Sequence, residues 1–181
     1  MEYLRPFVIV TGMTDRQPPD SPAAARAETL RQALTAAFPE IPAALADQFA
    51  QVVCDGPEGQ PVVHRLDKPY GRNLILAISG DYGLSCARLL PGRTTSYHRH
   101  ATRREFFAVR EGRLHLRDGD DRRILRCGDW GASTPGVAHQ LANAGNADCE
   151  FVEVFSPPLL EDKFRIDDPY SRPVGQVGLH E

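Results

Sequence analysis

From residue 61 onward, short apolar runs alternate with turn signals, and this pattern restricts the fold more than any other feature of the chain. The runs are rich in Val, Ile, Leu and Phe. Pairs such as Gly80-Asp81, Pro91-Gly92 and Asp118-Gly119 separate them at intervals of about ten residues. Strands of this length and spacing are typical of an all-β sandwich or barrel, whose closure also removes exposed strand edges. We therefore expect about nine or ten strands and no long helix after residue 56.

Before residue 56 the pattern is helical. Ser21 followed by Pro22 is a typical start of a helix. Apolar residues then recur at three- and four-residue spacing, first at Ala27, Leu30, Leu34 and Phe38 and again at Leu45, Phe49 and Val52 or Val53. The spacing predicts a helical hairpin over residues 21–53, and the run FVIVTGMTD at residues 7–15 predicts an edge strand or arm. We expect residues 1–60 to form an arm and hairpin packed on a barrel, with residues 61–181 forming that barrel and a C-terminal tail.

Charge and composition exclude several classes of function. The net charge of −3 argues against a nucleic-acid partner bound through a broad cationic face, and the arginines between Arg99 and Arg126 are expected on a solvated strand face. No apolar stretch approaches the ~18 residues that span a bilayer, and no signal peptide is evident, so we expect a cytoplasmic protein without a membrane partner. The four cysteines lie far apart with no CxxC pair, which indicates free thiols.

Histidine spacing indicates a metal site. His98 and His100 are two residues apart, so both imidazoles point to one face of a strand. Glu105 opens the returning strand, and His139 begins another strand further on. Three imidazoles and one carboxylate suit one divalent transition metal such as Mn, Fe, Ni or Zn, with positions left open for water or substrate. His115 shares the parity of two arginines and is expected to face solvent, and His64 and His180 have no evident partners.

These residues resemble the two motifs of the cupin superfamily. The first motif is matched at its fixed positions by Gly92, His98, His100, Glu105 and Gly112. The second is matched by Gly128, Gly136, His139 and Asn143, with Thr134 where the family has proline. The resemblance implies a mainly β fold, a double-stranded β-helix or jelly-roll barrel, carrying the metal on these four side chains.

Two further stretches are similar to the cupin domain of type II mannose-6-phosphate isomerases. Upstream stands Lys68-Pro69-Tyr70-Gly71. The tail carries Arg165, Asp167, Asp168, Tyr170 and Arg172, with Ser171 in place of a glycine. The likeness covers residues 66–173. That family usually has Gln at the position of His98, and its nucleotidyltransferase domain has no counterpart in residues 1–60.

The resemblance implies an isomerase or epimerase that acts on a sugar or sugar phosphate through a metal-stabilised enediolate. Such a reaction needs a base that the sequence does not identify. Alternatives are an iron-dependent dioxygenase, favoured by the full three-histidine set, and a non-catalytic sugar-binding or regulatory module. Cupins of this kind are often homodimers, and we expect one here.

Four residues are candidates for substrate binding. Arg103 shares the parity of Glu105 and could bind a phosphate or carboxylate, or instead orient Glu105. Arg165 and Arg172 lie on a tail that could fold over the barrel mouth. Tyr70 could line the cavity, as could Trp130, although aromatic residues more commonly occupy a core.

Overall fold

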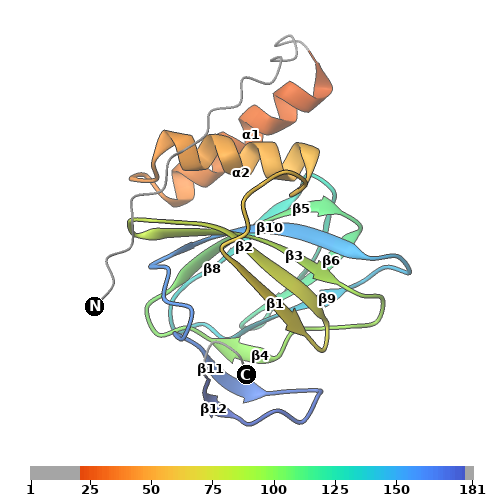
Figure 1. Cartoon of the computed structure of the whole chain (residues 1–181). Coiled ribbons are helices and arrows are strands. Elements are labelled where there is room, and N and C mark those ends of the chain that lie inside the picture. The colour runs from red at the N-terminus through yellow and green to blue at the C-terminus, as the bar shows by residue number, and fades with distance from the viewer. Residues whose placement is uncertain (1–20, 178–181) are drawn as a thin grey trace.

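The computed structural model describes residues 21–177, which form two helices and twelve strands (Figure 1). The helices are α1 (Pro22–Ala37) and α2 (Ala43–Asp55). The strands are β1 (His64–Lys68), β2 (Gly71–Ser79), β3 (Tyr82–Leu89), β4 (Tyr97–Arg99), β5 (Arg104–Glu111), β6 (Arg113–Asp118), β7 (Asp121–Arg126), β8 (Trp130–Ser133), β9 (His139–Asn143), β10 (Cys149–Ser156), β11 (Phe164–Asp167) and β12 (Gly175–Gln176). The strand predicted at residues 7–15, and His180, lie outside the described residues.

The strands make two antiparallel sheets of six strands each. Sheet A has the order β1-β2-β3-β10-β5-β8, and sheet B has the order β12-β11-β4-β9-β6-β7. Together they form a cupin-type jelly roll, which confirms the predicted fold class. The predicted nine or ten strands were too few for the described residues. The reason is that β4 spans three residues and β12 only two, which is too short for an alternating pattern to be visible.

The predicted helical hairpin is present and covers the outer face of sheet A (Figure 1). Ser21 caps α1, because its hydroxyl accepts a hydrogen bond from the Ala24 amide at 3.2 Å. Phe49 is fully buried and meets Phe106 of β5 edge to face, with ring centroids 5.8 Å apart. The hairpin and the sheet therefore share one apolar core, formed by Leu30, Leu34, Phe38, Ile41, Leu45, Ala46, Phe49, Val52, Val53, Leu76, Leu84, Cys86, Phe106, Ala108, Val152 and Val154.

A second apolar core fills the space between the two sheets. Strand β5 separates the two cores, because Phe106 and Ala108 face the helices while Phe107 and Val109 face the barrel interior. The interior core consists of Tyr70, Ala87, Leu89, Phe107, Val109, Leu114, Leu116, Leu125, Leu141, Cys149 and Phe151. Glu105 has the interior parity of Phe107 and pairs in register with Ser133 and Phe155, which brings a carboxylate into the barrel.

The C-terminal tail folds back onto sheet B. Strand β11 pairs antiparallel with β4, the strand that carries His98, and Arg165 lies opposite this histidine. The Tyr170 hydroxyl donates to the Thr94 carbonyl at 2.8 Å, which fastens the tail further. Neither helix in residues 21–177 is long and apolar enough to cross a lipid bilayer.

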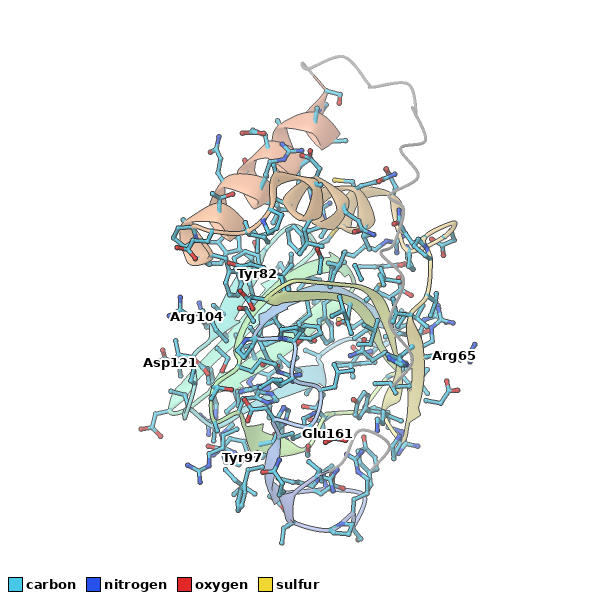
Figure 2. The ribbon with its side chains drawn as sticks, turned by 60° about the vertical axis from the view of Figure 1, so that its left-hand side comes forward. Arg65, Tyr82, Tyr97, Arg104, Asp121 and Glu161 are labelled. Atoms are coloured by element: carbon cyan, nitrogen blue, oxygen red, sulfur yellow. The ribbon has the colours of Figure 1, made fainter. Side chains whose placement is uncertain are left out.

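The outer face of sheet B is rich in arginine, as the sequence predicted for a solvated strand face. In the β6–β7 pair, Arg113 lies opposite Arg126, and Arg117 lies opposite Arg122. The Arg117 guanidinium stacks on the Tyr97 ring, 3.9 Å from its centroid. Tyr97 lies on the outside of the barrel in Figure 2. Within residues 21–177 none of these four arginines pairs with a carboxylate, so the face carries uncompensated positive charge.

Candidate metal centre and adjoining cavity

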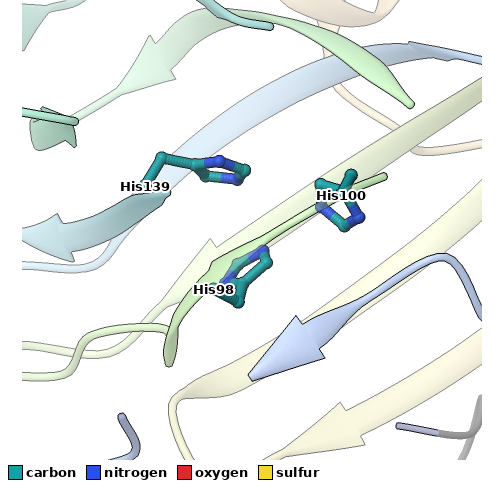
Figure 3. Close-up of side chains that lie close together, drawn as sticks. All are labelled: His98, His100 and His139. Carbon is teal, nitrogen blue, oxygen red and sulfur yellow. The ribbon is translucent and has the colours of Figure 1, made fainter. Parts of the chain in front are cut away.

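Three imidazoles gather inside the barrel, as Figure 3 shows for His98, His100 and His139. His98 and His139 face each other across β4 and β9, and His100 follows on the same side of its strand. The ring centroids lie 4.5 to 5.4 Å apart, and one ring nitrogen of each histidine lies within 4.8 Å of the others. All three side chains are buried. The strand register therefore brings together residues that are distant in sequence.

The hydrogen-bond partners of the Nδ1 atoms indicate which nitrogen of each ring carries the proton. His98 Nδ1 lies 2.8 Å from the Ser96 carbonyl, and His100 Nδ1 contacts the Asp162 carbonyl. His139 Nδ1 lies 2.9 Å from the Ser133 hydroxyl. A carbonyl oxygen only accepts hydrogen bonds, so Nδ1 of His98 and His100 carries the proton and Nε2 keeps a lone pair. Burial lowers the pKa of His98 well below its usual range and lowers that of His100, which keeps both rings uncharged.

The Glu105 carboxylate joins this group. Its Oε1 lies 3.0 Å from His100 Nε2 and 2.7 Å from Arg103 Nη2, and its Oε2 lies 2.9 Å from His139 Nε2. Burial alone would raise the pKa of Glu105, but the positive charge of the adjoining Arg103 helps to hold it well below its usual range, so the group is a carboxylate. Oε2 is buried and accepts no hydrogen bond within the described residues.

The donor set fits a divalent metal. The Glu105 carboxylate oxygens lie about 3 Å from the Nε2 atoms of His100 and His139. A cation shared between these lone pairs and the anionic oxygens would stabilise the arrangement. The carbonyls behind the His98 and His100 rings give the outer support common for metal-bound histidines. His98, His100 and His139 form the compact group, while Glu105 touches two of them. The ligand role of these residues remains a prediction, and the residues fit it.

Arg103 lies against the metal centre. Its Nη2 donates to His100 Nε2 at 2.9 Å as well as to Glu105 Oε1, and its guanidinium packs over the Phe155 ring. This geometry supports the predicted alternative in which Arg103 orients Glu105. A metal bond from His100 Nε2 and a hydrogen bond from Arg103 to the same lone pair exclude each other.

A cavity adjoins the centre on the tail side of the barrel. It is lined by five basic side chains and one carboxyl group, that of Glu153, and all four predicted substrate residues line it. Its wall consists of Leu66, Lys68, Tyr70, Asn73, Ile75, Ser96, Arg103, Glu153, Phe155, Leu160, Lys163, Arg165 and Arg172. Trp130 does not line it; this side chain is 44% exposed and stacks on Phe106.

The cavity shifts the pKa values of three titratable groups that line it. Burial, together with the charge of Glu105, raises the pKa of Glu153 to about 8, so Glu153 carries a proton at neutral pH. Burial raises the pKa of Tyr70 to about 12, so its phenol stays a hydrogen-bond donor. Burial and the nearby Arg103 lower the pKa of Lys163 to about 8. The cavity is thus cationic overall and contains groups able to exchange protons near neutral pH.

The two tail arginines line the cavity but are already paired. Arg172 donates twice to Asp168 Oδ2, at 3.0 and 2.7 Å, and its guanidinium lies 5.9 Å from the centre of the Tyr70 ring. Arg165 is fully buried, donates to the Pro173 carbonyl and lies 3.4 Å from Asp168. Because one carboxylate offsets both charges, an incoming anion competes with Asp168. Their substrate role stays a prediction.

Sequence reasoning missed Asp162. This carboxylate accepts hydrogen bonds from the backbone amides of Ala101, Thr102 and Arg103 at 2.8 to 2.9 Å and from the Thr102 hydroxyl at 2.7 Å. Its carbonyl meets His100 Nδ1, so one tail residue fixes both the turn and the ring. The partners are about sixty residues apart in sequence, and no local pattern links them.

Lys163 and Glu153 were also missed. In sequence each resembles an ordinary surface charge. The one available signal was that Glu153 interrupts the apolar run FVEVF.

Comparisons with known proteins agree with this architecture. Residues 86–155, which include all four predicted ligands, match the family model described as "Cupin domain". KdgF from Halomonas sp. is 21% identical over 52% of this chain and 87% of its own, with a TM-score of 0.49. AerE from Microcystis aeruginosa is 18% identical over 53% of this chain and 46% of its own, with a TM-score of 0.50.

A sugar phosphate isomerase from a cupin superfamily, from Silicibacter pomeroyi, is 26% identical over 52% of this chain and 71% of its own, with a TM-score of 0.46. No curated protein matches the chain. These likenesses concern the fold. The narrower resemblance to type II mannose-6-phosphate isomerases stays a prediction.

Proposed function

We propose that this cupin-fold protein is a metal-dependent isomerase or epimerase of a sugar or sugar phosphate. The observation that carries the proposal is the convergence of three buried imidazoles and Glu105 beside a cationic cavity. His98, His100, His139 and Glu105 would hold one divalent metal of the Mn, Fe, Ni or Zn class. A metal bound there would act as a Lewis acid that polarises a carbonyl and its neighbouring hydroxyl.

The chain's own residues supply binding and orientation. Arg103 keeps Glu105 ionised and oriented, while the buried site limits access of water. The amines of Lys68 and Lys163 favour an anionic substrate in the cavity, and the protonated Tyr70 offers it a hydrogen-bond donor. These features support a small, polar, negatively charged substrate.

A second candidate is an iron-dependent dioxygenase. It is favoured by the donor set, since three histidines and one carboxylate also suit redox-active iron. A non-catalytic sugar-binding or regulatory module is the third candidate. The expected homodimer is likewise a proposal, which light scattering of the purified protein would test.

The first experiment is elemental analysis of the purified protein, followed by activity assays with each metal. Anaerobic interconversion of an aldose phosphate and its ketose, lost in His139→Ala, is the result we expect. His115→Ala is the matched control, because His115 lies on the outer face of sheet B, away from the cluster. Oxygen uptake that follows iron content would favour the dioxygenase instead. If the protein binds sugar but shows no turnover with any of the metals, the result would favour the non-catalytic binding module.

A further inference from the structure

The two lysines of this chain share one location. Of its 21 basic residues only Lys68 and Lys163 are lysines, and both line the cavity beside the metal centre. The two come from distant parts of the chain, the end of β1 and the residue before β11. Within the described residues, the positive charges on the outer face of sheet B are arginines, and so are the other three cations of the cavity, Arg103, Arg165 and Arg172.

Lysine and arginine differ in whether the side chain can lose its positive charge on burial. A guanidinium remains charged at every physiological pH, whereas a lysine amine can lose its proton when burial disfavours the charge. Arg103, Arg165 and Arg172 already supply fixed positive charge to this cavity, so a further fixed charge would not require lysine. The placement of both amines in this cavity therefore indicates a need for a group that can gain and lose a proton.

The backbone of Lys163 is hydrogen-bonded through both its amide and its carbonyl. Its amide donates to the Glu161 carbonyl at 2.9 Å, and its carbonyl accepts from the Val177 amide at 3.0 Å. Within residues 21–177 its amine forms neither a hydrogen bond nor a close ion pair. The preceding residue, Asp162, holds the turn that carries Arg103, so the position of Lys163 is tied to the metal centre.

Charged groups from several elements face Lys163. Arg103 and Lys68 disfavour a further positive charge, while the Glu105 carboxylate favours it, as does Glu153 once it is ionised. Burial is the largest influence, and the resulting pKa of about 8 leaves a substantial uncharged fraction at pH 7 to 8. An amine with a pKa near the working pH is well suited to transfer protons in both directions.

We propose that Lys163 is the proton-transfer residue of this cavity. The inference rests on the proposed isomerase function. The uncharged amine takes the proton from the carbon beside the substrate carbonyl, so that a C–H bond breaks, an N–H bond forms and the electron pair stays on the substrate. The resulting ammonium then returns the proton to the former carbonyl carbon, while the hydroxyl proton of the substrate passes to the former carbonyl oxygen, so that the carbonyl and hydroxyl groups exchange places. No oxidant or reductant is consumed, and the amine is regenerated.

The first arm of the test does not depend on activity. Competitive acetylation by acetic anhydride, followed by peptide mass spectrometry across pH 6 to 11, measures when each lysine becomes uncharged. Arg65→Lys adds an exposed reference lysine on the same strand as Lys68. The reference should titrate near 10.4. We expect Lys163 to titrate about two pH units lower. A Lys163 midpoint equal to that of the reference lysine would overturn the inference.

The second arm measures turnover and hydrogen exchange. Lys163→Arg and Lys163→Met should keep the metal content and unfolding midpoint of the wild type, lose at least ~100-fold in kcat, and stop exchange of the substrate C–H with D₂O. Lys163→Arg with kcat within threefold of the wild type would refute the proton-transfer role. Wild-type protein that binds metal but isomerises no sugar phosphate would instead refute the proposed function, and the acetylation arm would still decide whether Lys163 is the titrating amine.

Discussion

Replacing Asp162 with Asn should weaken both the fold and the metal centre. The asparagine side chain has one oxygen where the carboxylate has two. Either the hydrogen bond from the Ala101 backbone amide or the three hydrogen bonds at Oδ2 are therefore lost. A hydrogen bond to a charged group contributes about 1.5–3 kcal/mol. The hydrogen bonds from Thr102, Ala101 and Arg103 outweigh the effect of burial and lower the Asp162 pKa from 3.8 to about 2. Since Asp162 is partly exposed, the shift corresponds to about 1–2 kcal/mol after solvent screening.

The stability difference should depend on pH in a defined direction. Because the folded-state pKa is lower than the ordinary value, the stabilisation is complete above pH 4 to 5 and is lost as the pH falls toward about 2. At pH 7 we expect Asp162→Asn to lose about 1–2 kcal/mol, a shift of about 1 M in the urea midpoint of chelator-treated protein. Below about pH 2 the two proteins should converge.

The same variant should bind metal about 10-fold more weakly, because the loosened tail no longer holds the carbonyl that orients His100. The matched control is Glu161→Gln, which changes the charge of the exposed neighbour labelled in Figure 2. Urea unfolding and isothermal titration with Zn²⁺ measure the two effects. If Asp162→Asn behaves like Glu161→Gln in both assays, the reasoning about the turn is refuted.

Three further predictions concern the core, the metal and the tail. Phe49→Ala should cost about 3–5 kcal/mol in urea unfolding because it removes a fully buried ring, whereas the exposed Gln51→Ala should stay within about 0.5 kcal/mol. Metal at about 100 times its Kd should stabilise the protein by about 2.7 kcal/mol; thermal unfolding should show this gain vanish in His139→Ala and persist in His115→Ala. Arg172→Gln should weaken sugar-phosphate binding about 10-fold by calorimetry. An unchanged affinity, equal to that of an Arg126→Gln control, would contradict the predicted clamp.

Residue spacing predicted a β sandwich or barrel, and the resemblance to the cupin motifs then predicted the jelly roll and the histidine cluster. The i, i+2 relation of His98 and His100 fixes a common face, and pairing of β4 with β9 then brings in His139. The hairpin was predictable because its apolar stripe and its Ser21 cap are local signals. These signals involve residues that lie close together in the chain, so they can be read from a single sequence.

The rest of the site depends on where the tail folds. Asp162 contacts the turn at residues 100–103 only when the tail folds back and β11 pairs with β4, and nothing in residues 157–177 alone specifies that pairing. The sequence likewise indicated Arg165 and Arg172 as substrate-binding candidates but did not identify Asp168 as their partner, whereas the structure shows both beside it. A lone pattern of charges predicts neither burial nor pairing.

The arginine face of sheet B limits how two copies of the chain could assemble. In a dimer with two-fold symmetry, a surface on the axis meets its own copy, so it must be complementary to itself. Arg113, Arg117, Arg122 and Arg126 would then face another set of the same guanidinium groups. Two such charges about 4 Å apart repel by about 4 kcal/mol at an effective dielectric constant of 20. The axis of a symmetric pair would therefore pass through a different side of the barrel, so that this arginine face does not pack against its own copy.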